Sequence, residues 1–184
     1  MSESALILTW TGFQDQEVVY PYYRLLAAGF DVDIIADKAD GLGRVYGILG
    51  VGMPCENFIA NFIENFNLNL KKYDLLVLPG GVKALEKLRL GPELIRFIKE
   101  WHLAGKVIAS TCHGAQLLIS AGITQGKVIS GYYSLEVDIK NSGATYSSDP
   151  VVTDSKIVSS PHYNYMGEWM EESLKVYQSW KDQS

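Results

Sequence analysis

One short segment of the chain carries the residues best suited to chemistry. Cys112 and His113 follow a buried apolar run at residues 106–110, and Gly114 opens a helical pattern directly after them. A cysteine at a tight strand-to-helix turn is typical of a nucleophile elbow, in which the turn lifts the side chain into a cleft. The next helix directs backbone N–H groups and its positive dipole end at the sulfur, which favours thiolate over thiol. The alternative is an inert cysteine that only fills space in the core.

Two further features fall at the same edge of the predicted sheet. In an open α/β sheet ligands bind at the carboxyl ends of the strands, so the Gly80-Gly81 turn should lie near Cys112. The backbone N–H groups of such a turn can face a bound anion. The loop after the first strand leads to Glu17. Burial would keep this carboxyl protonated, and it would then donate a hydrogen bond to a thiolate. Alternatively, Glu17 only complements the dipole of its helix.

The three histidines have different prospects. His113 adjoins Cys112 and is either its general base or a polar wall of the pocket. His162 follows the last predicted strand and is a second candidate, whereas His102 is expected on a helix surface in water. Because the chain has no cluster of His, Cys and Asp at ligand spacing, we expect no metal site.

The apolar pattern alternates between strands and helices. A helix after the first strand has an apolar face of Val18, Tyr22, Leu25 and Leu26, and we place Pro21 in its first turn, because proline disrupts a helix interior. Strands are expected at residues 5–10, 31–36, 73–78, 106–110 and 126–130, with a hairpin at residues 151–160. Further helices are expected at residues 92–104, where Gly91-Pro92 begins the helix and Gly105 ends it, and at residues 115–121 and 166–177. This alternation predicts an α/β fold with a mostly parallel sheet.

Two other segments are less regular. Phe58, Phe62 and Phe66 recur at a spacing of four, which indicates an aromatic face that packs on the domain or on a partner subunit rather than a ligand pocket. Residues 135–141 form either a strand or a helix, and we favour a helix with Ser134 as its N-cap.

Composition narrows the class of protein. The chain has 184 residues, with 47% hydrophobic residues, 20% charged residues and a formal net charge of −5. We therefore expect a single domain over residues 1–184, no nucleic-acid partner and no membrane span. The N-terminus has no pattern of a targeting segment, which indicates a cytoplasmic protein. In a reducing compartment Cys55 and Cys112 should both be free thiols.

Three segments carry a family resemblance: residues 17–24 (Glu-Val-Val-Tyr-Pro-Tyr-Tyr-Arg), residues 75–81 (Leu-Leu-Val-Leu-Pro-Gly-Gly) and residues 109–116 (Ala-Ser-Thr-Cys-His-Gly-Ala-Gln). Over nearly its whole length the chain resembles the ThiJ/PfpI superfamily, which includes PfpI-type intracellular peptidases and the parkinsonism-associated deglycase. The resemblance implies a flavodoxin-like three-layer sandwich, similar to class I glutamine amidotransferases.

The resemblance also implies roles for particular residues. Cys112 corresponds to the family nucleophile, Glu17 to the protonated glutamate that contacts it, and His113 to the neighbouring histidine. The amides of Gly81 and His113 look like the family's anion hole. Glu86 stands near the position of a glutamate that reaches the histidine of a neighbouring subunit.

This chain also departs from the family pattern. Family members often have Ser-Arg at the end of the last strand, whereas residues 159–162 read Ser-Ser-Pro-His. The arginine is missing, and His162 takes a place beside the expected pocket, together with Gly80 and Gly114.

Three functions follow from these residues. The first is an enzyme without added cofactor in which Cys112 attacks a small reactive carbonyl such as methylglyoxal and lactate is released. The second is a peptidase or amidohydrolase that uses Cys112, His113 and Glu86 across a subunit interface. The third is an oxidation sensor based on the Cys112 sulfur. Hydration of an isocyanide-type substrate is a further family possibility. By resemblance, we expect a homodimer or a larger homo-oligomer.

Overall fold

The computed structural model describes residues 3–55 and 57–183, and its core is a seven-stranded sheet in the order β10-β11-β7-β6-β1-β2-β5. All neighbouring strands are parallel except β10 and β11, which form the predicted hairpin. The strands of this sheet are β1 (Glu3–Leu8), β2 (Phe30–Ala36), β5 (Asn57–Phe58), β6 (Leu75–Leu78), β7 (Val107–Thr111), β10 (Val152–Asp154) and β11 (Ile157–Ser160).

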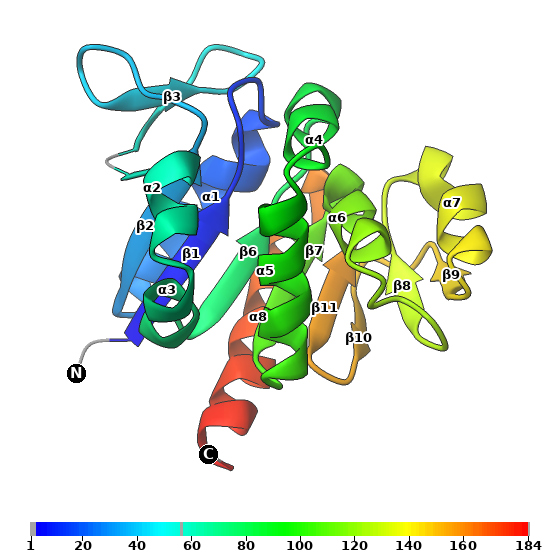
Figure 1. Cartoon of the computed structure of the whole chain (residues 1–184). Helices are drawn as coiled ribbons and strands as arrows, with labels where there is room; N and C mark the ends of the chain where they lie inside the picture. The colour runs from blue at the N-terminus through cyan, green and yellow to red at the C-terminus, as the bar shows by residue number, and fades with distance from the viewer. Residues whose placement is uncertain (1–2, 56, 184) are drawn as a thin grey trace.

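Helices cover both faces of the sheet (Figure 1). On one face, α1 (Asp15–Ala27) packs beside α8 (Met166–Lys181). The opposite face carries α2 (Ile59–Glu64), α3 (Phe66–Lys72), α4 (Val82–Leu88), α5 (Pro92–Leu103) and α6 (Ala115–Ser120). This three-layer arrangement confirms the predicted α/β fold with a mostly parallel sheet.

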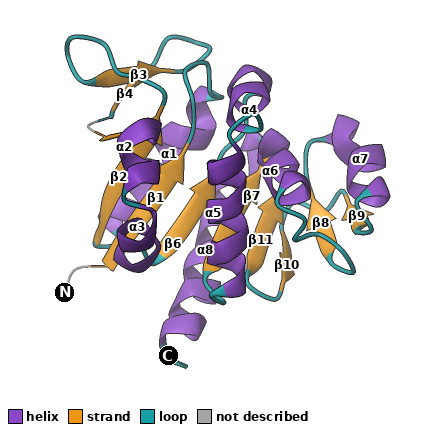
Figure 2. Cartoon of the chain, in the orientation of Figure 1, coloured by secondary structure: helices purple, strands orange, loops and turns teal. Residues whose placement is uncertain are grey.

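Two small sheets lie outside the main one (Figure 2). The hairpin of β3 (Arg44–Tyr46) and β4 (Gly52–Pro54) is antiparallel, whereas β8 (Val128–Ser130) and β9 (Thr145–Ser147) pair in parallel. The short helix α7 (Glu136–Asn141) packs near β9. The helix favoured for residues 135–141 is therefore confirmed. The prediction that Ser134 is its N-cap is wrong, because Ser134 lies inside a preceding 3-10 helix (Tyr133–Leu135). Leu135 takes the N-cap position, without a side-chain hydrogen bond.

The core is one continuous cluster of buried apolar side chains. Two buried tryptophans bond to the sheet from opposite layers: Trp101 Nε1 donates to the carbonyl of Val107 (3.0 Å), and Trp169 Nε1 donates to that of Val158 (3.3 Å). Both indole donors are thereby satisfied, so that the large rings are buried without the penalty of an unpaired N–H group.

Two predictions about helices need correction. Pro21 lies in the middle of α1 rather than in its first turn, because the helix already begins at Asp15. The acidic residues Asp15 and Glu17 occupy its first turn, where they complement the helix dipole. His102 is half-buried on α5, and its Nδ1 is enclosed without a hydrogen-bond partner, so it is not the solvated side chain that we expected.

The aromatic face at Phe62 and Phe66 packs inside the chain. The rings of Phe62 and Phe66 lie 4.8 Å and 5.4 Å from that of Phe97, with interplanar angles of 70° and 81°. Phe62 is buried by these contacts, so its ring is not available to a partner subunit.

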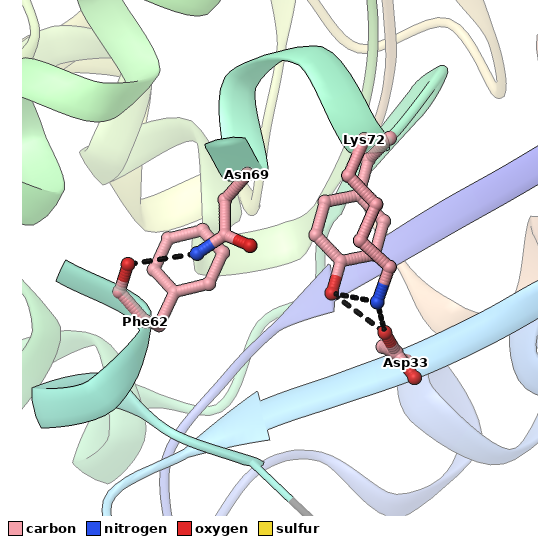
Figure 3. A network of polar contacts seen from close by, with 5 residues as sticks. Asp33, Phe62, Asn69 and Lys72 are labelled. Atoms are coloured by element: carbon pink, nitrogen blue, oxygen red, sulfur yellow. Dashed lines mark hydrogen bonds and ion pairs between the residues drawn. The ribbon is translucent and has the colours of Figure 1, made fainter. Parts of the chain in front are cut away.

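Polar contacts fix the same corner of the fold (Figure 3). Asn69 Nδ2 donates to the carbonyl of Phe62 (2.8 Å) and joins α2 to α3. Lys72 Nζ and the hydroxyl of Tyr73 both donate to one carboxylate oxygen of Asp33 on β2, at 2.5 Å and 2.6 Å. These bonds tie the end of α3 to the sheet.

Candidate active site

Cys112 stands where β7 ends and the chain turns into α6. Its φ is +55°, and Cys112 and Ser155 are the non-glycine residues with positive φ in the described ranges. A side chain in this left-handed region strains the backbone, and such strain is concentrated at functional sites. The residues from Cys112 to Gly114 form one 3-10 turn before α6 begins. The structure therefore has the tight strand-to-helix turn that the sequence predicted.

Glycines make this turn sterically possible. A Cβ on Gly114 would lie 2.2 Å from the carbonyl oxygen of Leu78, so only glycine lets the turn approach β6 this closely. A Cβ on Gly80 would lie 2.5 Å from Glu17 Oε2 and 3.0 Å from Cys112 Sγ. The carboxyl group of Glu17 and the thiol of Cys112 thus both lie against Gly80, in space that a side chain at this position would fill.

Glu17 is completely buried beside the thiol. The N–H of Gly80 donates to its Oε2 at 2.6 Å, and its Oε1 has no hydrogen-bond partner among the described residues. Burial raises the pKa of Glu17 to about 7, although the bond from Gly80 and the contact with Cys112 lower it. The prediction that burial favours the protonated carboxyl is consistent with this direction.

Cys112 as a residue is only 6% exposed. Burial, followed by the charge of Glu17, raises the pKa of the Cys112 thiol, whereas the N–H groups of His113 and Gly81 lower it. These two N–H groups belong to the 3-10 turn and to the Gly80-Gly81 turn rather than to α6, and burial outweighs them, so our expectation that helix amides make thiolate the favoured form is wrong. The contact between the two groups acts in opposite directions, because the thiol lowers the pKa of Glu17 while the charge of Glu17 raises that of the thiol.

The imidazole of His113 also contacts the sulfur. Its Nδ1 lies 3.3 Å from Cys112 Sγ, and burial lowers the pKa of the imidazole, which favours the neutral ring. The ring stacks on Tyr132, with centroids 4.7 Å apart and an interplanar angle of 27°. A neutral imidazole at this distance can accept the thiol proton.

The other predicted residues lie farther from the sulfur. His162 follows β11, and its ring lies 6.2 Å from that of Tyr132, which separates it from His113. Glu86 is an exposed residue on α4. Cys55 is buried, and its thiol donates to the carbonyl of Asn57 (3.3 Å).

Two residues of this region were missed in the sequence. The N–H of Tyr132 donates to the carbonyl of Cys112 (3.0 Å), which ties the segment before α7 to the turn. Asp15 is buried, and its carboxylate accepts bonds from the N–H groups of Leu49 (2.7 Å) and Val51 (2.9 Å), which holds the β3–β4 hairpin against α1. Neither role has a local sequence pattern, because both depend on contacts distant along the chain.

A groove of about 690 Å³ lies between α1, the β3–β4 hairpin and the start of α8. Its lining is mostly apolar, including Val19, Tyr20, Leu49, Tyr163 and Met166. In the described parts of the chain, no group of three or more His, Cys, Asp or Glu side chains is arranged to hold a metal ion, and no helix is long and apolar enough to cross a membrane.

The sequence and the fold match a known family of proteins. The sequence pattern of the DJ-1/PfpI family matches residues 3–176. Deglycase PfpI of Pyrococcus furiosus is 34% identical over 93% of this chain and 97% of its own length, and a deglycase of Thermococcus kodakarensis is 35% identical over the same shares. The chain therefore belongs to the DJ-1/PfpI family, as the sequence resemblance implied.

A solved structure gives the same result for the fold. A two-domain protein from Anabaena variabilis, which contains DJ-1/ThiJ/PfpI-like and ferritin-like domains, superposes with a TM-score of 0.84 at 26% identity. The match covers 94% of this chain and 47% of that protein, so this chain spans about half of its length.

Proposed function

We propose that this protein is a cysteine-dependent enzyme of the deglycase or glyoxalase kind, which acts on small reactive carbonyls without an added cofactor. The observation that carries the proposal is the meeting of three groups at one strained turn: the Cys112 thiol, the protonatable carboxyl of Glu17 and the neutral imidazole of His113. The deglycase relatives, at 34% and 35% identity over 93% of the chain, support the same assignment.

The chemistry begins with addition of the sulfur to the aldehyde carbon of an α-oxoaldehyde. The thiol proton passes to His113 or Glu17, a C–S bond forms, and the carbonyl oxygen takes up a proton to give a hemithioacetal. The N–H groups of Gly81 and His113 point at the sulfur and stabilise negative charge there before the attack.

Proton transfer within the adduct then completes the reaction. His113 removes the proton from the former aldehyde carbon, and the ketone oxygen takes up a proton to give an enediol. The adjacent carbon is then protonated and the hydroxyl on the sulfur-bearing carbon loses its proton, which yields the thioester of a 2-hydroxy acid. Water cleaves the thioester, releases the acid and restores the thiol. One substrate carbon is oxidised while its neighbour is reduced, so the sequence needs no external oxidant or reductant.

The deciding measurement is lactate formation from methylglyoxal without glutathione. We expect turnover by the wild type and loss of at least about 100-fold in Cys112→Ala, in line with the loss of a nucleophile. Cys55→Ala is the matched control, because it removes the other buried thiol at a distance from the site. Lactate formation by Cys112→Ala at the wild-type rate would refute the proposal.

The other two functions become outcomes of the same set of assays. A reduced, reactive thiol without lactate formation, together with cleavage of a peptide panel, would favour the peptidase. Peroxide oxidation confined to Cys112, with no turnover of either substrate class, would favour the sensor.

We further propose that the protein works as a homo-oligomer. Apolar residues that line the groove remain exposed in the single chain, among them Tyr20, Leu49 and Val51. Such a patch is typical of a subunit interface. The exposed Glu86 is free to approach His113 of a neighbouring copy. Sedimentation equilibrium measures the assembly directly, and a monomer at all accessible concentrations would contradict this part.

A further inference from the structure

Four aromatic rings continue outward from His113 along one side of the thiol site. Tyr132 stacks on His113, and His162 lies nearly parallel to Tyr132 and to Tyr133, at 6.2 Å and 6.3 Å with interplanar angles of 26° and 20°. Tyr163 follows, with its ring centroid 3.9 Å from that of His162. We call Tyr132, Tyr133, His162 and Tyr163 the aromatic wall.

The aromatic wall is fixed to the element that holds the nucleophile. The N–H of Tyr132 donates to the carbonyl of Cys112, and His162 lies two residues after the end of β11, the strand that pairs with β7. The Nδ1 of His162 accepts a bond from the N–H of Asn164 (3.2 Å), which orients the imidazole. The rings therefore stand at a defined place relative to the sulfur.

Part of the aromatic wall is exposed. Tyr133 is 48% exposed as a residue, while Tyr132 and His162 are half-buried. Tyr163, which is 37% exposed, also lines the groove proposed as a subunit contact, so Tyr133 is the exposed member on which the inference depends. Exposed aromatic faces bind planar apolar groups by stacking, and each such pair contributes beyond its buried area. The methyl group of methylglyoxal would cover little of this surface.

Building on the proposed function, we infer that the preferred substrate is an α-oxoaldehyde with an aryl group on its ketone carbon. The aryl group stacks on the aromatic wall while the aldehyde carbon meets Cys112 Sγ. The overall reaction adds one water to an aryl glyoxal and gives the aryl 2-hydroxy acid. Its steps are those of the proposed function: formation of the C–S bond, proton transfer between the two carbons and hydrolysis of the thioester, which restores the thiol.

The test compares kcat/KM for phenylglyoxal, measured as mandelate, with kcat/KM for methylglyoxal, measured as lactate. We expect a preference for phenylglyoxal of about tenfold in the wild type. Tyr133→Ala should lower this ratio by about threefold or more, whereas Tyr133→Phe, which keeps the ring, should retain it. Tyr46→Ala removes a tyrosine of similar exposure, 36%, from the β3–β4 hairpin and should leave the ratio unchanged.

The outcomes separate the two proposals. Equal values for the two aldehydes, or a ratio that Tyr133→Ala does not change, would overturn the aryl preference while leaving the carbonyl chemistry standing. No Cys112-dependent turnover of either aldehyde would overturn the proposed function itself. Parallel reactions with Cys112→Ala subtract spontaneous conversion and consumption of phenylglyoxal by arginine side chains.

Discussion

The buried carboxyl of Glu17 should cost this protein stability at neutral pH, and Glu17→Gln should recover it. In the folded chain Glu17 keeps its proton up to a pKa of about 7, whereas its ordinary value is 4.5. Below pH 4.5 the carboxyl is protonated in both the folded and the unfolded state, and the two states are affected equally. Between these values the unfolded chain loses the proton first, so the stability present at low pH is lost as the pH rises to about 7.

The magnitude follows from the same two values. At about 1.4 kcal/mol per pKa unit, the loss approaches about 3 kcal/mol above neutrality. By pH 5 somewhat less than 1 kcal/mol of it has been lost. Glutamine stays neutral, and its side-chain oxygen can still accept the bond from Gly80. The stability of Glu17→Gln minus that of the wild type, measured as the free energy of unfolding, should therefore be about 2–3 kcal/mol larger at pH 8 than at pH 5.

Urea unfolding at pH 5 and pH 8, at one fixed protein concentration, measures this difference. With typical slopes, the relative shift in midpoint is about 1–2 M urea. Glu64→Gln provides the control, because it makes the same change at an exposed site on α2 that has no part in the proposed chemistry. A shift of equal size at both pH values would show only that glutamine packs better, and no shift at either pH would refute the buried-carboxyl argument. Turnover should fall in Glu17→Gln even as stability rises, because glutamine cannot release a proton.

Two further substitutions test the local packing. Gly80→Ala places a methyl group 2.5 Å from Glu17 Oε2, and it should slow both alkylation of the Cys112 thiol and substrate turnover by at least about tenfold. Gly41→Ala is the matched control, because no atom lies within 4 Å of its added methyl group. Equal alkylation rates in the two variants would contradict the expectation. Asp15→Ala removes the acceptor for two N–H groups of the β3–β4 hairpin, so it should lower the free energy of unfolding by about 1–2 kcal/mol and speed proteolysis of the hairpin. Asp15→Asn keeps one acceptor, so its stability and its proteolysis rate should lie between those of the wild type and Asp15→Ala. Unchanged proteolysis of Asp15→Ala would show that other contacts hold the hairpin.

The elements of the fold could be predicted because their signals are local. The apolar run at Lys106 to Ser110 becomes β7 almost residue for residue, and the turn at Ser155 joins two strands as expected. Pro21 shows the limit of this reasoning. Its effect on a helix depends on where the helix begins, and α1 begins at Asp15, whose carboxylate bonds to a hairpin more than thirty residues away instead of marking the helix start with a side-chain cap.

The protonation of the site residues could not be predicted in the same way as the elements of the fold. The residue types at Cys112, His113 and Glu17 were visible in the sequence, but their protonation depends on how completely the surrounding chain excludes water. Helix amides were expected to favour thiolate, yet burial raises the pKa of both Cys112 and Glu17. Burial raises the pKa of both groups, while the contact with Cys112 lowers that of Glu17 and the charge of Glu17 raises that of the thiol. Residue types alone do not encode this balance, because the burial of the two side chains depends on segments that are distant along the chain.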